Sequence, residues 1–373
     1  MPRPKSKSKK SNQKKFKAPY VFREESQLVL GGNEESPRLH FPSSDNFVAD
    51  AGPGCHIAHP ESSDWILGWE AVHADDFDAD EVSNIPDIAI DPESGTLTVC
   101  NLHHYSLVAY ITVYEMRLRD VHGLILKQGS TTNDKGETNQ VTTLIVLCPP
   151  ETFAHLCVIL PLEETEISSY QIDLEQLRLE SDVQPWNQHP DPSDVYHDLF
   201  LAFPLRTDST NPSFLCTQGI HGHLTHFFSG NLHAIDFRCP AGTPLLAVAD
   251  AVVVQVQDHH NCTGIAVTNL FHWNSILLQV KNTAPDKPLF VEYVHIQSAL
   301  VSVGDQVQTG QVIGTSGSVG FSPEPHLHFA AYRSDHPTAP TVQVSFAGKQ
   351  GPYIPRAHAW YNDDGLVVPE AAS

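Results

Sequence analysis

The order of apolar and polar residues along the chain is typical of short β-strands. From about residue 62 onward, runs rich in β-branched and aromatic residues recur, each bounded by Gly, Pro, Asn or Asp. They include TLTVCNL, SLVAYITVYEMRLRD, TLIVLCPP and HLCVILPLE in the first half, and HAIDFRCP, PLLAVADAVVVQVQD, NSILLQV, PLFVEYVHI and HLHFAAYR in the second. Regularly spaced short strands predict packed antiparallel sheets, so we expect a mainly β protein.

The length of the chain and the breaks in this pattern predict two folded domains, because a single core rarely organises 373 residues. We expect a β-sandwich-like domain over residues 19–162 and a second β domain over 206–348. Between them we place a linker over 163–205, where the prolines of PWNQHPDPSD interrupt regular structure. Residues 1–18 are expected to be a disordered basic tail, and 349–373 a C-terminal extension.

Charge is distributed unevenly. Residues 1–17 hold eight of the 22 Lys and Arg and no acid, which leaves 14 basic against 44 acidic residues in the remainder. Because an acidic body repels phosphate backbones, we expect no nucleic-acid binding by the folded part. The tail MPRPKSKSKKSNQKK fits either a nuclear address or a solubilising arm, and its composition does not decide between them.

Nothing in the sequence directs the chain to a membrane or out of the cell. No apolar stretch approaches the roughly 20 residues of a membrane span, and no apolar segment follows the charged N-terminus. The seven cysteines are scattered and never form a CxxC pair, so neither a disulfide framework nor a thiolate zinc site is indicated. We therefore expect a cytoplasmic location, with the nucleus as the alternative that the basic tail allows.

Three segments of the second half hold the residues that hydrolysis needs, namely LTHFFSGNLHAIDF, EYVHI and EPHLHFAAY. Strand alternation directs His326 and His328 to the same face, with Leu327 behind them. A hydrolytic zinc site takes three His or carboxylate ligands and keeps one position for water. A further histidine pair can accept the proton of that water and stabilise the oxyanion, and our candidates for it are His295 and His326.

Taken together, these segments resemble the lysostaphin/LytM-type zinc endopeptidases, also called β-lytic metallopeptidases, from about Cys216 to Ala347. The landmarks are THFFSGNLHAIDFRCPAGTPLLAVADAVV, the YVHI strand, the Gly-rich hairpin VGDQVQTGQVIGTSG and the final PHLHF. The resemblance implies an antiparallel β-sheet peptidase domain of this type over 206–348, with one zinc ion as its cofactor.

The resemblance also implies which residues bind zinc. The aspartate and the second histidine of His-x-His are ligands in this family, which here are Asp236 and His328. Many members place the first ligand four residues before the aspartate, where this chain has Leu232. Others have a longer loop with a Ser/Thr-His, and on that pattern the first ligand is His226, with His233 as the alternative. The family assigns catalytic assistance to the positions of the His295 and His326 pair.

Two functions compete at this point. The first is a zinc-dependent endopeptidase that hydrolyses peptide bonds, with a peptide or peptidoglycan-like substrate implied by the resemblance. The second is a non-catalytic zinc-containing scaffold, whose peptidase-like domain offers a groove while the N-terminal β domain contacts a protein partner. Because the chain keeps all five candidate residues, the sequence favours the enzyme.

Overall fold

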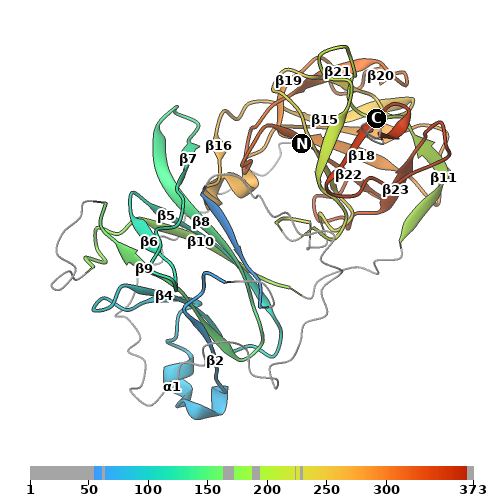
Figure 1. Cartoon of the computed structure of the whole chain (residues 1–373). Helices are drawn as coiled ribbons and strands as arrows, with labels where there is room; N and C mark the ends of the chain where they lie inside the picture. Colours follow the sequence, from blue (N-terminus) through green and yellow to red (C-terminus); the bar gives the residue numbers. More distant parts are fainter. Residues whose placement is uncertain are drawn as a thin grey trace, which may run out of the picture.

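The computed structural model describes residues 54–60, 64–162, 172–186, 194–222, 224–226 and 230–367. β-strands dominate these residues, which confirms the mainly β fold, and they form two domains that lie side by side (Figure 1). The expected basic tail over 1–18 and the start of the expected sandwich over 19–53 fall outside the described residues. None of the described helices has the length and apolar character to cross a membrane.

The N-terminal domain contains two sheets. The first has the order β2-β9-β4-β3, with β6 also on β9, and its strands are β2 (Gly68–Ala71), β3 (Ile88–Ile90), β4 (Thr96–Asn101), β6 (Arg117–Arg119) and β9 (Thr152–Leu160). The second has the order β10-β5-β8-β7-β16, with β1 on β8, and its strands are β1 (Cys55–Ala58), β5 (Leu107–Tyr114), β7 (Gly129–Thr132), β8 (Thr138–Cys148), β10 (Leu179–Pro185) and β16 (Thr263–Gly264). Two short helices, η2 (Ala74–Asp76) and α1 (Ala79–Val82), connect β2 to β3.

Apolar side chains from both sheets pack into one core. Ile111 and Leu144 of the second sheet join Leu97 and Leu156 of the first in a single cluster, and all four are fully buried. Burying a side chain of this size contributes about 1.5–3 kcal/mol relative to leaving it exposed. This shared core holds the two sheets face to face.

The C-terminal domain is built on a nine-stranded antiparallel sheet with the order β20-β15-β17-β18-β22-β13-β12-β24-β25. Its strands are β12 (Phe214–Gln218), β13 (Ile235–Arg238), β15 (Ala251–Gln257), β17 (Ser275–Val280), β18 (Phe290–Val294), β20 (Gln306–Val307), β22 (His326–Tyr332), β24 (Ala359–Asn362) and β25 (Gly365–Val367). Two smaller sheets accompany it, formed by β14 (Pro244–Leu246), β21 (Val312–Ser316) and β19 (Ile296–Ala299), and by β11 (Val195–Leu201) with β23 (Gln343–Phe346).

The two faces of the nine-stranded sheet have different chemistry, because alternate residues of a strand point to opposite sides. Phe237 of β13 and Phe329 of β22 belong to the hydrophobic core of the domain, as does Tyr293 of β18. On the other face, Asp236 stands directly opposite His328 of the neighbouring strand. The core side thus fixes the register that brings these two polar residues together.

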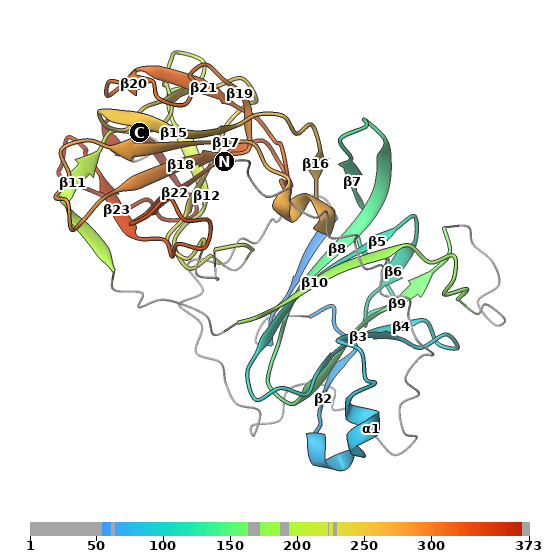
Figure 2. The same cartoon turned by 180° about the vertical axis from the view of Figure 1, so that it is seen from behind.

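The domains meet along the second N-terminal sheet. The short strand β16 and the 3-10 helix η4 (Val267–Phe271) extend from the C-terminal domain toward this sheet (Figure 2), and β16 pairs with β7. Tyr110 and Ile145 on its outer face share a hydrophobic cluster with Val267 and Phe321 of the C-terminal domain. All eight residues of β5 are buried, because one face meets the sandwich core and the other meets the second domain.

Two predicted boundaries differ from the structure. The segment 163–205, expected to be a linker, contains β10, which pairs with β5, and β11, which pairs with β23. The segment 349–373, expected to be an extension, contains β24 and β25, which continue the nine-stranded sheet beyond β12. β10, β24 and β25 occupy or approach sheet edges, where partial exposure permits polar residues and weakens the apolar alternation that marks a strand.

Candidate metal centre

The cluster formed by His226, Asp236 and His328 lies on the polar face of the nine-stranded sheet. All three residues are buried, with exposures of 0%, 4% and 5% respectively. Nδ1 of His328 lies 2.9 Å from Oδ1 of Asp236. Nε2 of His226 lies 3.2 Å from both of these atoms. Three potential metal ligands that are far apart in sequence thus converge on one point.

The spacing of the three ligand atoms fits a small divalent cation. Zinc binds imidazole nitrogen and carboxylate oxygen at about 2.0–2.2 Å, so two ligands of a tetrahedral site lie about 3.3 Å apart. A triangle with sides of 2.9, 3.2 and 3.2 Å has a circumscribed circle of about 1.8 Å radius, which leaves a point about 2 Å from all three atoms beside its plane.

Hydrogen bonds set which nitrogen each ligand presents. Nδ1 of His226 lies 2.9 Å from the carbonyl oxygen of Gly219. Because a carbonyl can only accept, this nitrogen carries the proton and Nε2 keeps a free lone pair. His328 presents Nδ1 to the same point, beside the Asp236 carboxylate. Lone pairs that face one another repel unless a cation or a proton lies between them, so the donor set suits a metal.

The electrostatics of the cluster favour the protonation states that bind metal. Burial alone would raise the pKa of the Asp236 carboxyl, but the neighbouring imidazoles of His226, His326 and His328 hold it well below its usual range. Burial lowers the pKa of His328, against the opposing effect of the Asp236 charge. An ionised carboxylate and a neutral imidazole are the forms in which these residues ligate metals.

His295 and His326 form a second pair beside this cluster, with ring centroids 4.5 Å apart. Nδ1 of His295 donates to the carbonyl of Val319 at 2.7 Å, and Nδ1 of His326 donates to that of Glu324 at 2.8 Å. Nε2 of His326 lies 3.8 Å from Oδ1 of Asp236. The backbone at His295 has a φ of 62°, a left-handed conformation that a non-glycine residue rarely adopts. The surrounding structure therefore holds this ring in place at a cost in backbone energy.

The pKa of His295 indicates the protonation state of its ring. Burial and the charges of His326 and His328 lower it well below the ordinary value for histidine. The ring is therefore neutral near neutral pH, with Nδ1–H committed to the backbone and Nε2 able to accept a proton.

His233, the alternative first ligand in the sequence, lies outside the metal-capable group. Its Nδ1 lies 3.0 Å from the carbonyl of Thr341, and its main-chain N–H donates to the hydroxyl of Thr341. The structure thus brings His226, rather than His233, to Asp236 and His328.

Gln218 connects the ligands to the loop that carries His226, although no motif or spacing in the sequence singled it out. It is 1% exposed. Its Nε2 donates to Oδ2 of Asp236 at 2.7 Å and to the Thr225 hydroxyl at 3.0 Å. Its Oε1 accepts the main-chain N–H groups of Leu224, Thr225 and His226 at 3.1, 3.0 and 3.3 Å. One side chain thus satisfies three backbone donors and orients the Asp236 carboxylate.

A cleft opens over the metal cluster and is lined by residues of both domains. The C-terminal domain supplies Asp236, His295, His326 and His328, while the N-terminal domain supplies Tyr110 of β5 and Gln184 of β10. The hydroxyl of Tyr110 donates to the carbonyl of Leu224, two residues before His226, at 3.2 Å. No motif or spacing pointed to these N-terminal residues, because their role arises from the docking of the domains.

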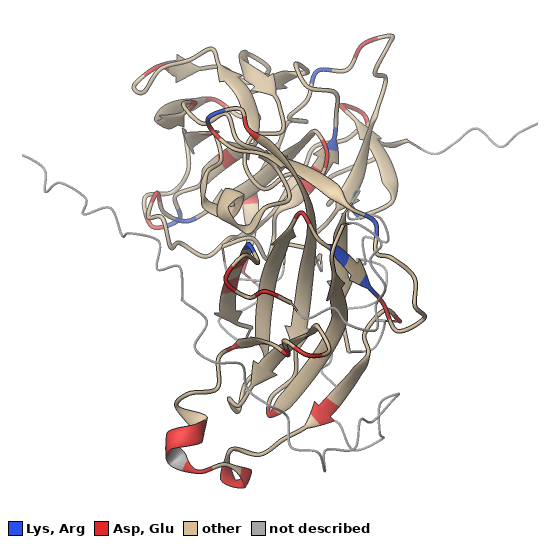
Figure 3. Cartoon of the chain, turned by 90° about the vertical axis from the view of Figure 1, so that its left-hand side faces the viewer, with Lys and Arg blue, Asp and Glu red and all other residues tan. Residues whose placement is uncertain are grey.

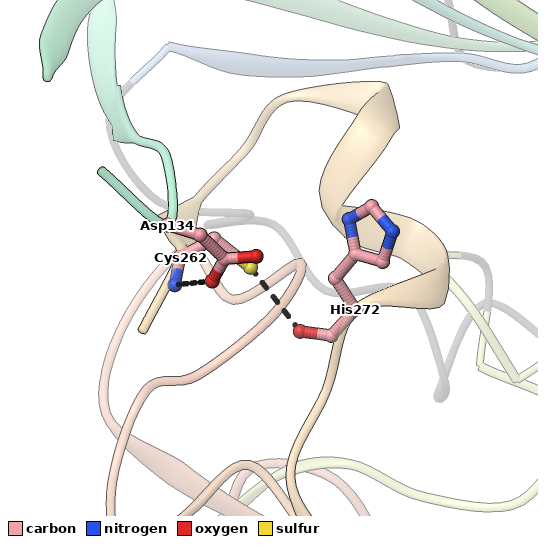
Figure 4. Close-up of side chains that lie close together, drawn as sticks. All are labelled: Asp134, Cys262 and His272. Carbon is pink, nitrogen blue, oxygen red and sulfur yellow. Dashed lines mark hydrogen bonds between the residues drawn. The ribbon is translucent and has the colours of Figure 1, made fainter. Parts of the chain in front are cut away.

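A second group of metal-capable side chains, Asp134, Cys262 and His272, joins the domains (Figure 4). Oδ1 of Asp134 accepts the main-chain N–H of Cys262 at 3.0 Å, and the Cys262 thiol donates to the carbonyl oxygen of His272 at 3.2 Å. Burial raises the pKa of the Cys262 thiol to about 11, so it remains protonated near neutral pH. These contacts connect the β7–β8 hairpin to the C-terminal domain, so a structural role accounts for the group.

Comparison with known proteins shows which family this part of the chain resembles. Residues 230–340 match Peptidase family M23, a range that contains Asp236, His295, His326 and His328 and begins after His226. The glycyl-glycine endopeptidase ALE-1 of Staphylococcus capitis is 38% identical over 100 residues, which make up 27% of this chain and 24% of that protein. The peptidoglycan DD-endopeptidase ShyC of Vibrio cholerae is 34% identical over 133 residues, or 35% of this chain and 26% of that protein.

Among solved structures, the catalytic domain of a prophage-encoded M23 protein from Enterococcus faecalis is 26% identical, with a TM-score of 0.28. That match covers 38% of this chain and 94% of the other. The chain spans about a quarter of the length of the two curated relatives, and the family match lies in its second half.

Proposed function

The C-terminal domain belongs to peptidase family M23, and from this premise we propose that the protein is a zinc-dependent endopeptidase that hydrolyses peptide amide bonds. The observation that supports the proposal most strongly is the convergence of His226 Nε2, Asp236 Oδ1 and His328 Nδ1 within 3.2 Å of one another in a buried site that lines a cleft. We assign these three residues as ligands of one zinc ion.

The chemistry divides between the ion and the second histidine pair. Zinc, when bound, supplies a Lewis acid that lowers the pKa of water toward about 7 and polarises an amide carbonyl. His295, neutral and fixed by its bond to Val319, accepts the proton of the attacking water at Nε2. His326, fixed by its bond to Glu324, donates a hydrogen bond to the developing oxyanion when its Nε2 is protonated.

The names of the relatives support the proposal about the substrate. One relative is named a glycyl-glycine endopeptidase and another a peptidoglycan DD-endopeptidase, so we include a peptidoglycan-type peptide among the proposed substrates. The N-terminal domain, which forms one wall of the cleft, is proposed to contact the substrate or a protein partner.

Incubation of the purified full chain with zinc tests this function. The substrates are intact peptidoglycan and short oligoglycine peptides, and new amino termini are quantified by amine labelling and mass spectrometry. We expect cleavage that stops on addition of a chelator and is absent in the His328→Ala variant. Stoichiometric zinc without cleavage of either substrate or of a broad peptide library would favour the non-catalytic scaffold instead.

A further inference from the structure

Glu292 is a carboxylate of the cleft that the proposed chemistry does not use. Glu292 of β18 is paired with Ala330 of β22, and Val294, two residues later, is paired with His328. Glu292 and His328 therefore project from the same face of the sheet and line the same cleft.

The Glu292 carboxylate is held by neutral donors. The Tyr332 hydroxyl donates to its Oε2 at 3.1 Å, and the side chains of Ser275 and Trp273 also hydrogen-bond to it. Burial raises the pKa of Glu292, while these three hydrogen bonds oppose the rise by stabilising the ionised form. The donors fix the position of the carboxylate without neutralising its charge.

Glu292 has no Lys or Arg beside it among the described residues that line the cleft. The other two carboxylates there already have partners, since Asp236 belongs to the ligand cluster and Glu324 pairs with Arg238 at 2.7 Å. Acidic residues also outnumber basic ones over the described part of both domains (Figure 3). The Glu292 carboxylate should therefore attract a cationic group of a substrate locally, beside the metal cluster.

Aromatic side chains line the same cleft. They are Phe271, Trp273 and Phe321 of the C-terminal domain and Tyr110 of the N-terminal domain, in addition to Tyr332. Aromatic faces attract an ammonium group and pack against its aliphatic stem, most strongly where water is excluded. A fixed carboxylate in a cleft that aromatic rings also line suits an alkylammonium group.

We propose that Glu292 and its neighbours Trp273 and Tyr332, the part of the cleft that we call the recess, bind a primary ammonium group of the substrate. This group is supplied by a lysine-type side chain or by the amino terminus of a peptide. The enzyme then selects peptides that carry such a group near the scissile amide. The placement of the scissile bond rests on the proposed function, whereas binding of the amine does not require turnover.

Binding measurements on the zinc-loaded full chain test the recess. The probes are Gly-rich peptides blocked at both ends that carry a central lysine, Nε-acetyl-lysine or glutamate. A fourth peptide has norleucine at the centre and a free amino terminus, so that it separates the two sources of the amine. We expect the peptide with a central lysine, or the peptide with a free amino terminus, to bind roughly tenfold or more tightly than the acetyl-lysine peptide. A charge-assisted hydrogen bond together with cation–π contacts has this magnitude.

Two variants locate the effect. Glu292→Gln keeps the shape of the side chain and should abolish the preference for the amine. Glu180→Gln is the matched control, because Glu180 also accepts from a tyrosine, Tyr114, at 2.8 Å but does not line the cleft. It should leave the preference unchanged.

The outcomes separate the recess from the proposed function. Equal binding of the lysine, acetyl-lysine and free-amino-terminus peptides by the wild-type chain would overturn the recess. A preference for the amine that survives Glu292→Gln would overturn it as well. If peptides are cut without regard to the amine, the peptidase stands and the recess falls. If the amine preference depends on Glu292 but nothing is cut, the recess stands and the peptidase falls.

Discussion

Replacing Gln218 by alanine removes the side chain that connects Asp236 to the loop carrying His226. In the wild-type structure this side chain makes five hydrogen bonds, three of them to consecutive main-chain N–H groups. The variant leaves those donors and Oδ2 of Asp236 without their partner in a buried region. We therefore expect two separable losses, one in the stability of the metal-free protein and one in its affinity for zinc.

The magnitudes follow from these contacts. A buried polar group left without a partner costs about 1–3 kcal/mol, and three backbone donors together give about 3 kcal/mol at the lower end of that range. Loss of a residue that orients a metal ligand typically lowers metal affinity about 10–100-fold. Denaturant unfolding in the presence of chelator measures the first quantity, and competition with a chromophoric zinc chelator measures the second.

Gln184→Ala is the matched control, because Gln184 lines the same cleft without a hydrogen bond to the ligand cluster. It should bind zinc with wild-type affinity. Affinity within twofold of wild type in Gln218→Ala, even with a large loss of stability, would refute the view that this residue positions the ligands.

Three further predictions concern the proposed centre. His328→Ala should lose most of the bound zinc on elemental analysis, because two remaining ligands hold the ion too weakly. His295→Ala should keep zinc and lose turnover in a peptide-cleavage assay, and loss of zinc from this variant would mean that the ligand and catalytic roles are exchanged. Removal of zinc by a chelator should lower the free energy of unfolding by about 2.7 kcal/mol. The reference is the protein at a free zinc concentration one hundred times the dissociation constant. An unchanged denaturation midpoint would contradict a zinc site in the folded protein.

Much of the polar face could be predicted from the sequence. The alternation in HLHFAAY predicted a strand with His326 and His328 on one face, and the structure has β22 there, with Leu327 buried in the core. The likeness to a known family directed attention to Asp236, which pairs with His328 in register. Short-range periodicity is sufficient in these cases because it decides which way a side chain points.

Contacts between segments far apart in the chain were beyond this reasoning. Gln218 gains its importance from three backbone N–H groups on a loop, and no residue type marks that geometry. The choice between His226 and His233 likewise depends on which ring reaches Asp236 and His328, and no local pattern decides that. Tyr110 lines the cleft only because the second domain docks onto β5.

One signal of this docking was present in the sequence. The strand LVAYITVY is apolar without strict alternation, and such runs mark strands that are covered on both faces. The pattern does not say what covers the second face, because any apolar surface would serve. By contrast, β10, with the sequence LESDVQP, is only partly buried at its sheet edge and lacked the apolar alternation by which its pairing with β5 could have been predicted.

The zinc content of three purified proteins tests the central claim most directly. Plasma mass spectrometry on the wild-type chain, His226→Ala and His233→Ala should find about one ion per chain in the wild type and in His233→Ala, and little in His226→Ala, because three ligands are needed for tight binding. Zinc retained by His226→Ala but lost from His233→Ala would contradict the convergence of His226, Asp236 and His328 on one ion.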